Sequence, residues 1–358
     1  MIWLAWRQFR VQALSVAGGL LVFVGALALT WTRVTTLAEE TGFTGCRDDV
    51  ACRDAADRFL RAIGHESAGA LYLAGLVLLL VLPALLGIFW GAPLVARELE
   101  SGTYRMVFSQ TVSRRRWLLV KLAVGGIAAA LSVGLVSLVL TRWAAPIDAA
   151  GSSRVEPITF LARGIVPVAS AVLAFAVGVA VGLVLRRTLT AMAVTLLLVV
   201  AVQVVATPVM LRLLAQPITT VTPLRADTPM VLIVNTGTVH LDAGNDRISG
   251  AWMIEESVVT QAGKAFTGPV DATKCNISVK GELPEQCRDW LVAQNLGHQL
   301  TYVPGTRFWP LQWRVFGVLS ALTVALVLFS GGYLGGTPWS PFRRGSSAAP
   351  ATRSARRP

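Results

Sequence analysis

The chain has 358 residues, of which 54% are hydrophobic and only 15% are charged, against about 25% in a typical soluble domain. This composition excludes an ordinary soluble protein and predicts a helical protein that spans a membrane several times. The formal net charge of +12 would suit a nucleic-acid binder. The basic residues, however, gather in short segments between apolar runs, which is a pattern of membrane topology.

Residues 1–12 predict a short amphipathic helix on the inner membrane surface. Trp3 and Trp6 offer apolar bulk at roughly helical spacing, and Arg7 and Arg10 offer charge, a combination that suits the headgroup boundary.

Six apolar runs are long enough to cross a hydrocarbon core about 30 Å thick, which needs roughly 20 helical residues. None of them contains an acidic residue. The first could pass for a secretory signal, but it is longer than a usual signal core and five further runs follow, so we expect it to remain in the chain. The predicted spans are 13–32, 71–91, 118–141, 160–185, 189–211 and 313–334.

The first outer loop, residues 33–70, contains Cys46 and Cys52 and predicts a helix over 48–63 that stops at Gly64. We interpret this loop as a small solvated helical segment, with a substrate vestibule as the functional alternative.

The inner segment 92–117 connects the second and third spans. The letters "LVARELE" predict a helix that extends the second span, and Gly102 is a plausible stop for it. Ser113 can cap the next helix, because its hydroxyl can accept from first-turn amides. Basic residues at the membrane edge follow: Arg114, Arg115, Arg116 and Lys121.

The segment 212–309 is long enough for a small folded outer domain, with strand-like runs followed by a helical one. It contains Cys275 and Cys287. Four cysteines allow three pairings, of which pairing within each loop is the simplest in an oxidising compartment. The histidines form no metal-binding pattern, so we expect no metal. The tail 335–358 is rich in Pro, Ser, Ala and Arg and predicts disorder.

The charge distribution predicts that both termini are cytoplasmic, because basic residues in short loops stay inside. With six spans, the inner side receives fifteen of the 32 basic residues but only two of the 20 acids, Glu98 and Glu100. We interpret the positive charge as topology and contact with membrane lipid, and expect no nucleic-acid partner. The fifteen are Arg7, Arg10, Arg97, Arg105, Arg114, Arg115, Arg116, Lys121, Arg186, Arg187, Arg343, Arg344, Arg353, Arg356 and Arg357.

Polar side chains are rare within the predicted spans, and Gln203 is among the few strong hydrogen-bonding groups there. An ion-coupled transporter normally needs buried acids or histidines, so their absence from the spans disfavours that class. No cluster of catalytic residue types indicates a membrane enzyme. Gly178 and Gly182 match the Gly-x-x-x-Gly pattern, which we interpret as helix packing. No G-x-x-x-x-G-K-[ST] phosphate loop occurs, so ATP hydrolysis cannot be assigned to this chain.

The stretch "ARELESGTYRMVFSQTVSRRRWLLVKL" resembles the signature of ABC-2 type transporter permeases, and the form "GAPLVARELESGT" is similar to a branch common in high-GC actinobacteria. In that family a Glu-rich helix end runs into Gly-Thr, a short segment follows, and a lysine opens the next span. Thr111 stands where the family often has proline. The matching residues are Glu98, Glu100, Gly102, Thr103, Ser113, Arg114 and Lys121.

The resemblance implies an all-α polytopic protein with six transmembrane helices, to which the sequence adds a small mixed α/β domain between helices 5 and 6. It implies a permease that pairs with a second copy or a homologue and binds a separate ATPase. ATP and Mg²⁺ would lie on that ATPase, and this chain would bind no cofactor. The connector would be a coupling helix in a groove of the ATPase, with residues 186–188 as a smaller second contact. We assign to coupling Glu98, Glu100, Gly102, Thr103, Tyr104, Met106, Phe108 and Ser113.

The leading hypothesis is an exporter of a lipophilic or amphipathic substrate in a bacterial plasma membrane. Glu98 and Glu100 support an ATPase partner in this hypothesis, because the positive-inside rule does not explain acidic residues on the inner face. The alternatives are a force-transmitting protein that acts through its outer domain, and an ion-coupled secondary transporter.

Overall fold

The computed structural model describes most of the chain, and for residues 2–13, 49–50, 231–235, 238–242 and 335–336 it describes the backbone alone. The described residues are 2–46, 49–102, 113–151, 153–224, 231–235, 238–242, 250–268, 271, 273–275 and 284–336.

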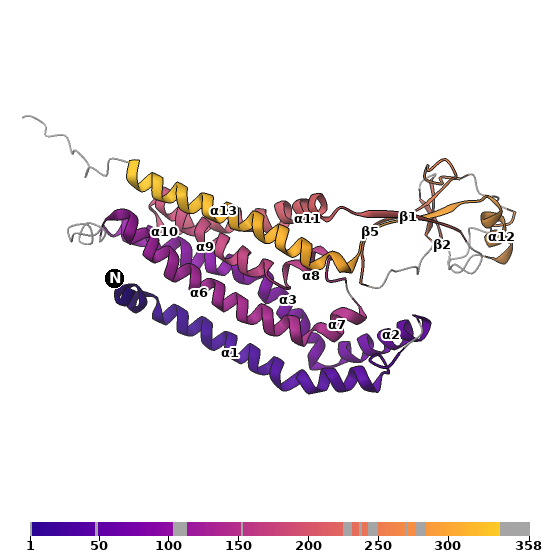
Figure 1. Ribbon diagram of the computed structural model, residues 1–358, viewed down its shortest axis with the longest axis horizontal. Coiled ribbons are helices and arrows are strands. Elements are labelled where there is room, and N and C mark those ends of the chain that lie inside the picture. The colour runs from indigo at the N-terminus through magenta and orange to yellow at the C-terminus, as the bar shows by residue number, and fades with distance from the viewer. Residues whose placement is uncertain are drawn as a thin grey trace, which may run out of the picture.

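Six helical segments of the described chain are long and apolar enough to cross a membrane (Figure 1). In chain order the first to sixth spans are α1 (Ile2–Glu40); α3 (Ser67–Leu86) with η1 (Gly87–Gly91) and α4 (Ala92–Glu100); α6 (Arg114–Trp143); α9 (Val166–Leu185); α10 (Thr188–Ala201) with η2 (Val202–Ala206) and α11 (Thr207–Ala215); and α13 (Phe308–Gly336).

Each predicted apolar run falls on one of these spans, and the fourth alone begins later than predicted. Residues before it form the short helix α8 (Pro157–Leu161) and a turn, because Gly164 adopts a left-handed conformation with φ +70°. Pro167 then stands in the first turn of α9, where its missing N–H costs nothing.

The fourth span is the centre of the bundle. Of its most apolar stretch 61% is buried, against 11% in the first span and 17% in the fifth and sixth. The helix α9 contacts α3, η1, α4, α6, α10 and α13. Large apolar side chains on the outer spans face away from the protein, as expected for contact with lipid tails. The N-terminus and the described end of α13 lie at one end of the bundle, here the inner end (Figure 1).

The second and fourth spans cross with almost no side chain between them. A Cβ atom on Gly182 would lie 2.6 Å from the carbonyl oxygen of Ala92, and one on Gly178 would lie closer still to the oxygen of Gly87. These contacts confirm the interpretation of the Gly-x-x-x-Gly pattern as packing, because backbone atoms cannot yield to a methyl group.

Two helix boundaries differ from the sequence prediction. A separate surface helix over residues 1–12 was expected, but α1 runs without a break from Ile2 to Glu40, because neither glycine nor proline interrupts its first turns. Gly64 was expected to end a helix, but it lies inside α2 (Asp49–His65). The break falls at Glu66, whose extended backbone begins the second span.

The outer domain lies between the fifth and sixth spans. A three-stranded antiparallel sheet has the order β1 (Ile218–Pro223), β5 (Gly297–Val303), β4 (Trp252–Val259), and β2 (Val231–Asn235) pairs with β3 (Thr238–Asp242). The helix α12 (Glu285–Ala293) completes the described part of the domain.

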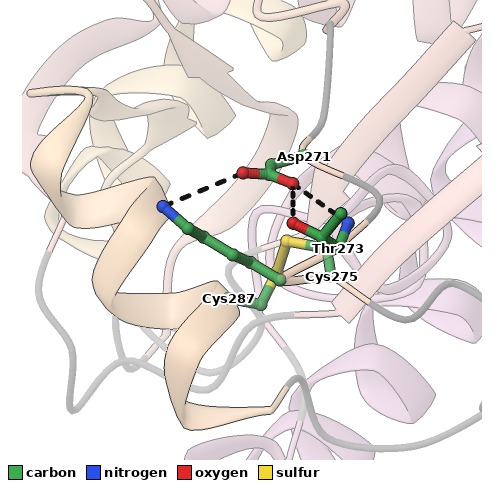
Figure 2. The surroundings of a disulfide bond; sticks show 5 residues. Asp271, Thr273, Cys275 and Cys287 are labelled. Atoms are coloured by element: carbon green, nitrogen blue, oxygen red, sulfur yellow. Dashed lines mark hydrogen bonds and ion pairs between the residues drawn. A yellow bond between two sulfur atoms is a disulfide. The ribbon is translucent and has the colours of Figure 1, made fainter.

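Both disulfides form within their own loops, Cys46 with Cys52 and Cys275 with Cys287. The second pair is buried with Leu291 in the small core of the outer domain. Beside it the Asp271 carboxylate accepts hydrogen bonds from Thr273 and pairs with a lysine side chain (Figure 2). The simplest of the three possible pairings is therefore the one observed.

Candidate functional site

The connector at the inner end begins and ends as the sequence predicts. The helix α4 stops after Glu100, and Gly102 follows it in a left-handed conformation with φ +72° that glycine adopts without steric cost. At the far side the Ser113 hydroxyl accepts from the Arg116 amide at 3.4 Å and caps α6. The predicted coupling residues between these ends lie outside the described residues: Thr103, Tyr104, Met106 and Phe108.

Glu98 joins the second span to the third. Its carboxylate lies 2.5 Å from the Lys121 ammonium, which also donates to the Leu94 carbonyl oxygen at 3.2 Å and lies 4.5 Å from the centre of the Trp117 ring. The Lys121 side chain is only 7% exposed. Lys121 was predicted to lie at the membrane interface, and its ammonium turns into the bundle, where a charge within a span needs a partner.

Glu100 joins the second span to the fifth. Its Oε2 atom accepts from the Thr188 backbone amide at 2.9 Å and from the Thr188 hydroxyl at 2.7 Å. Thr188 is the first residue of α10, and Arg187 at the N-cap position makes no side-chain cap. The carboxylate therefore caps α10 from another helix, where the amides and the helix dipole favour an anion.

These two contacts change the interpretation of the inner acids. An external ATPase is not needed to explain why Glu98 and Glu100 occur there, because each has a partner on a neighbouring span. They hold α4, the first part of the connector, against the third and fifth spans. The turn at 186–188, expected as a second partner contact, is thereby fixed beside the connector.

The inner surface beside these contacts is positively charged. The side chains of Trp3, Trp6, Arg7 and Arg10 lie in the part of α1 whose backbone alone is described. Among the residues whose side chains are described, the exposed cations on this surface are Arg97, Arg114, Arg115, Arg116, Arg186 and Arg187.

A buried ion pair, which was not predicted from the sequence, lies at the outer end. Asp148, on α7 (Ala145–Ala150), and Arg163 are both 0% exposed and approach to 2.9 Å. The carboxylate also accepts from the Tyr72 hydroxyl at 2.8 Å. The pair ties the outer ends of the second, third and fourth spans together. A lone arginine inside a predicted apolar run was the available signal, since such a residue needs a buried acid.

Gln312 fixes the sixth span to the start of the fourth. Its Oε1 atom accepts from the amides of Ile165 and Val166 at 3.0 Å each, and its Nε2 atom donates to the carbonyl oxygens of Phe160 and Arg163. Every polar atom of this fully buried amide is thus used.

Gln203 lies in η2 and donates to the carbonyl oxygen of Leu80 on the second span at 3.0 Å. It lines a small pocket with Ser170 and Thr207, whose free space of about 20 Å³ fits about one water molecule. Within the part of the chain that the structure describes, no group of three His, Cys, Asp or Glu side chains could hold a metal ion.

The fold and these contacts define a polytopic membrane protein in which the connector between the second and third spans is anchored to its neighbouring spans. Over residues 17–212, more than half of the chain, the sequence matches the family model described as ABC-2 membrane transporter related, and the chain belongs to that family. Members are typically non-catalytic membrane subunits. The match ends near the end of the fifth span, so the outer domain and sixth span lie beyond it. No curated protein and no solved structure matches the chain.

Proposed function

We propose that the chain is the permease subunit of an ABC exporter in a bacterial plasma membrane, of the actinobacterial branch. It moves a lipophilic or amphipathic substrate outward, driven by ATP hydrolysis in a separate ATPase subunit that holds ATP and Mg²⁺. Membership of the ABC-2 related family and the lack of a phosphate loop in the sequence support this division of labour. A second permease copy or a homologue completes the transporter.

The observation that carries the proposal is the anchoring of the connector. Glu98 binds Lys121 on the third span, and Glu100 binds Thr188 on the fifth. A connector held in this way moves with three spans, whereas a loose loop would absorb a push from the cytoplasm. The contacts thus suit a part on which an ATPase acts.

The experiment is purification of the tagged full chain from its own membranes in mild detergent, followed by reconstitution into nanodiscs. We expect an ATPase with a phosphate loop to co-purify in stoichiometric amount and to hydrolyse ATP. Placing a charge at Met106 or Phe108, by Met106→Glu or Phe108→Glu, should abolish co-purification. Glu39→Gln, at an exposed position of the outer end, is the control and should leave it unchanged. A chain that purifies alone refutes the proposal.

A force-transmitting protein that acts through its outer domain is the second candidate. The direct connection of the fifth and sixth spans to the sheet favours it, since β1 begins three residues after the end of α11. Uptake of a fluorescent amphipathic dye into inside-out vesicles that contain the complex separates the two. ATP-dependent uptake supports export, and ATP hydrolysis without uptake of any dye in a chemically varied panel supports the second candidate. The buried Asp148 carboxylate does not support the hypothesis of an ion-coupled transporter. It lies outside the candidate spans, and Arg163 neutralises its charge.

A further inference from the structure

The fifth span is attached to the second span at three levels. At the inner end Glu100 caps α10 through Thr188. One turn further out, Ala191 packs in a buried cluster with two alanines of α4. Beyond it, Gln203 in η2 donates to the backbone of Leu80. A displacement of the second span must therefore carry the fifth span with it, because the contacts lie both in the first turn of α10 and in η2.

The outer end of the fifth span is clamped to the start of the sixth. Arg307 donates to the carbonyl oxygens of Ala215 and Gln216, and Arg314 donates to the carbonyl oxygen of Leu214 at 3.0 Å. These carbonyls end α11 and have no partner inside their own helix. A cation is also favoured at this end of a helix dipole.

The strands of the outer domain connect directly to the ends of the fifth and sixth spans, without a long linker. The strand β1 pairs with β5 from Ile218 opposite Tyr302 to the far end of both strands. At the base of the sheet, Trp252 and Val303 belong to one buried cluster with Phe308 and Leu311 of the sixth span. Figure 1 shows the strands running on from α11 and α13 away from the bundle.

We propose that the fifth span transmits displacement of the inner connector to the outer domain. Glu100 is the positioning residue where the second span contacts the fifth, and Arg307 is the positioning residue where the fifth span contacts the sixth. The inference rests on the proposed function, because ATP binding by the partner ATPase supplies the displacement. In this arrangement the outer domain is a moving part of the transport cycle, and its position reports the state of the ATPase.

The test is a distance measurement by pulsed electron paramagnetic resonance on the permease–ATPase complex in nanodiscs. Spin labels go on Arg61→Cys in α2 and Asp289→Cys in α12, both exposed positions, and the native cysteines are all in disulfides. The distance distribution is recorded without nucleotide and with Mg-ATP plus vanadate. We expect a nucleotide-dependent shift in the otherwise unchanged chain, and its loss in both Glu100→Ala and Arg307→Ala while the ATPase still co-purifies.

Matched variants separate transmission from folding and docking. Glu100→Gln keeps an oxygen that can accept from Thr188, so it should retain most of the shift. Thr188→Val removes the hydroxyl contact and should reduce the shift, whereas Thr190→Val, the same change two residues on, should leave it intact. The Thr190 hydroxyl bonds only within its own turn, to Arg187. If Glu100→Ala does not fold, the comparison of Thr188→Val with Thr190→Val still tests the proposal.

Each outcome refers to one claim. A complex that hydrolyses ATP but shows no shift refutes the transmission and leaves the proposed function standing. Loss of the ATPase from Glu100→Ala, with Glu100→Gln losing it too, makes Glu100 a docking residue and refutes its positioning role. An unmodified chain that binds no ATPase refutes the proposed function, and the inference with it.

Discussion

Replacing Asp148 by asparagine tests the buried ion pair at the outer end. The change preserves shape but leaves the Arg163 guanidinium, 0% exposed, without its counter-charge at 2.9 Å. Removing one partner of such a pair typically costs about 3–5 kcal/mol, because the remaining charge stays out of water. Tyr72→Phe deletes a single hydrogen bond to the carboxylate and should cost less, about 1.5–3 kcal/mol. Removing both charges together, as Asp148→Leu with Arg163→Met, should recover most of the loss.

The assay is a double-mutant cycle measured by denaturant unfolding in mixed micelles, with thermal melting by size-exclusion chromatography as a check on folding. The coupling between positions 148 and 163 should be of the same size as the loss in the single variants. If Asp148→Asn changes the free energy of unfolding by less than about 1 kcal/mol, or if the two changes add without coupling, the pair is not buried as described.

Three further predictions concern other parts of the fold. Gly178→Ala should destabilise by about 1–3 kcal/mol, because its methyl group meets backbone atoms of the second span, while Gly317→Ala in open space should stabilise slightly; equal melting temperatures would contradict the close crossing. Replacing Cys275 and Cys287 together by serine should cost the outer domain about 3 kcal/mol, since the bond closes a loop of 12 residues, and unchanged protease resistance of the domain would contradict this. Hydrogen bonds from Thr273, its hydroxyl first, hold the pKa of Asp271 below its ordinary value of 3.8. This contribution to stability is present above pH 3.8 and is lost as the pH falls through the lowered pKa, so Thr273→Val should flatten the acid dependence of melting, and an unchanged acid limb would count against the assignment.

The features that depend on local sequence could be predicted. Long apolar runs locate the spans because about 20 helical residues must be apolar to cross a bilayer. The ends of the connector could be predicted as well. Gly102 ends the first helix through its left-handed backbone conformation, and Ser113 caps the next helix by accepting from a nearby amide. Pairing of cysteines within each loop followed from the shortest possible links.

The features that depend on tertiary contact could not. Arg163 and Asp148 are fifteen residues apart in different segments, and nothing in the sequence joins them. The contacts of Glu98 and Glu100 within the bundle were hidden for the same reason, because Lys121 and Thr188 lie on other spans. The direct continuation of the fifth span into the sheet was also hidden, since it depends on arginines nearly a hundred residues away along the chain.

The π-helical turn η1 affects how the second span would respond to the loss of a residue. Each residue of an α-helix turns the chain by about 100°, and a π turn accommodates one residue more than an α turn. Deleting one residue from Gly87–Gly91 would allow a regular helix and leave hydropathy almost unchanged. It would leave the helix beyond it in nearly the same phase, because the π turn absorbs its extra residue locally. The same deletion in the regular helix at residues 92–95 would rotate everything beyond it by about 100°, which would swing Glu98 away from Lys121 and Glu100 away from Thr188. Loss of one residue should therefore be better tolerated within η1 than in the first turn of α4.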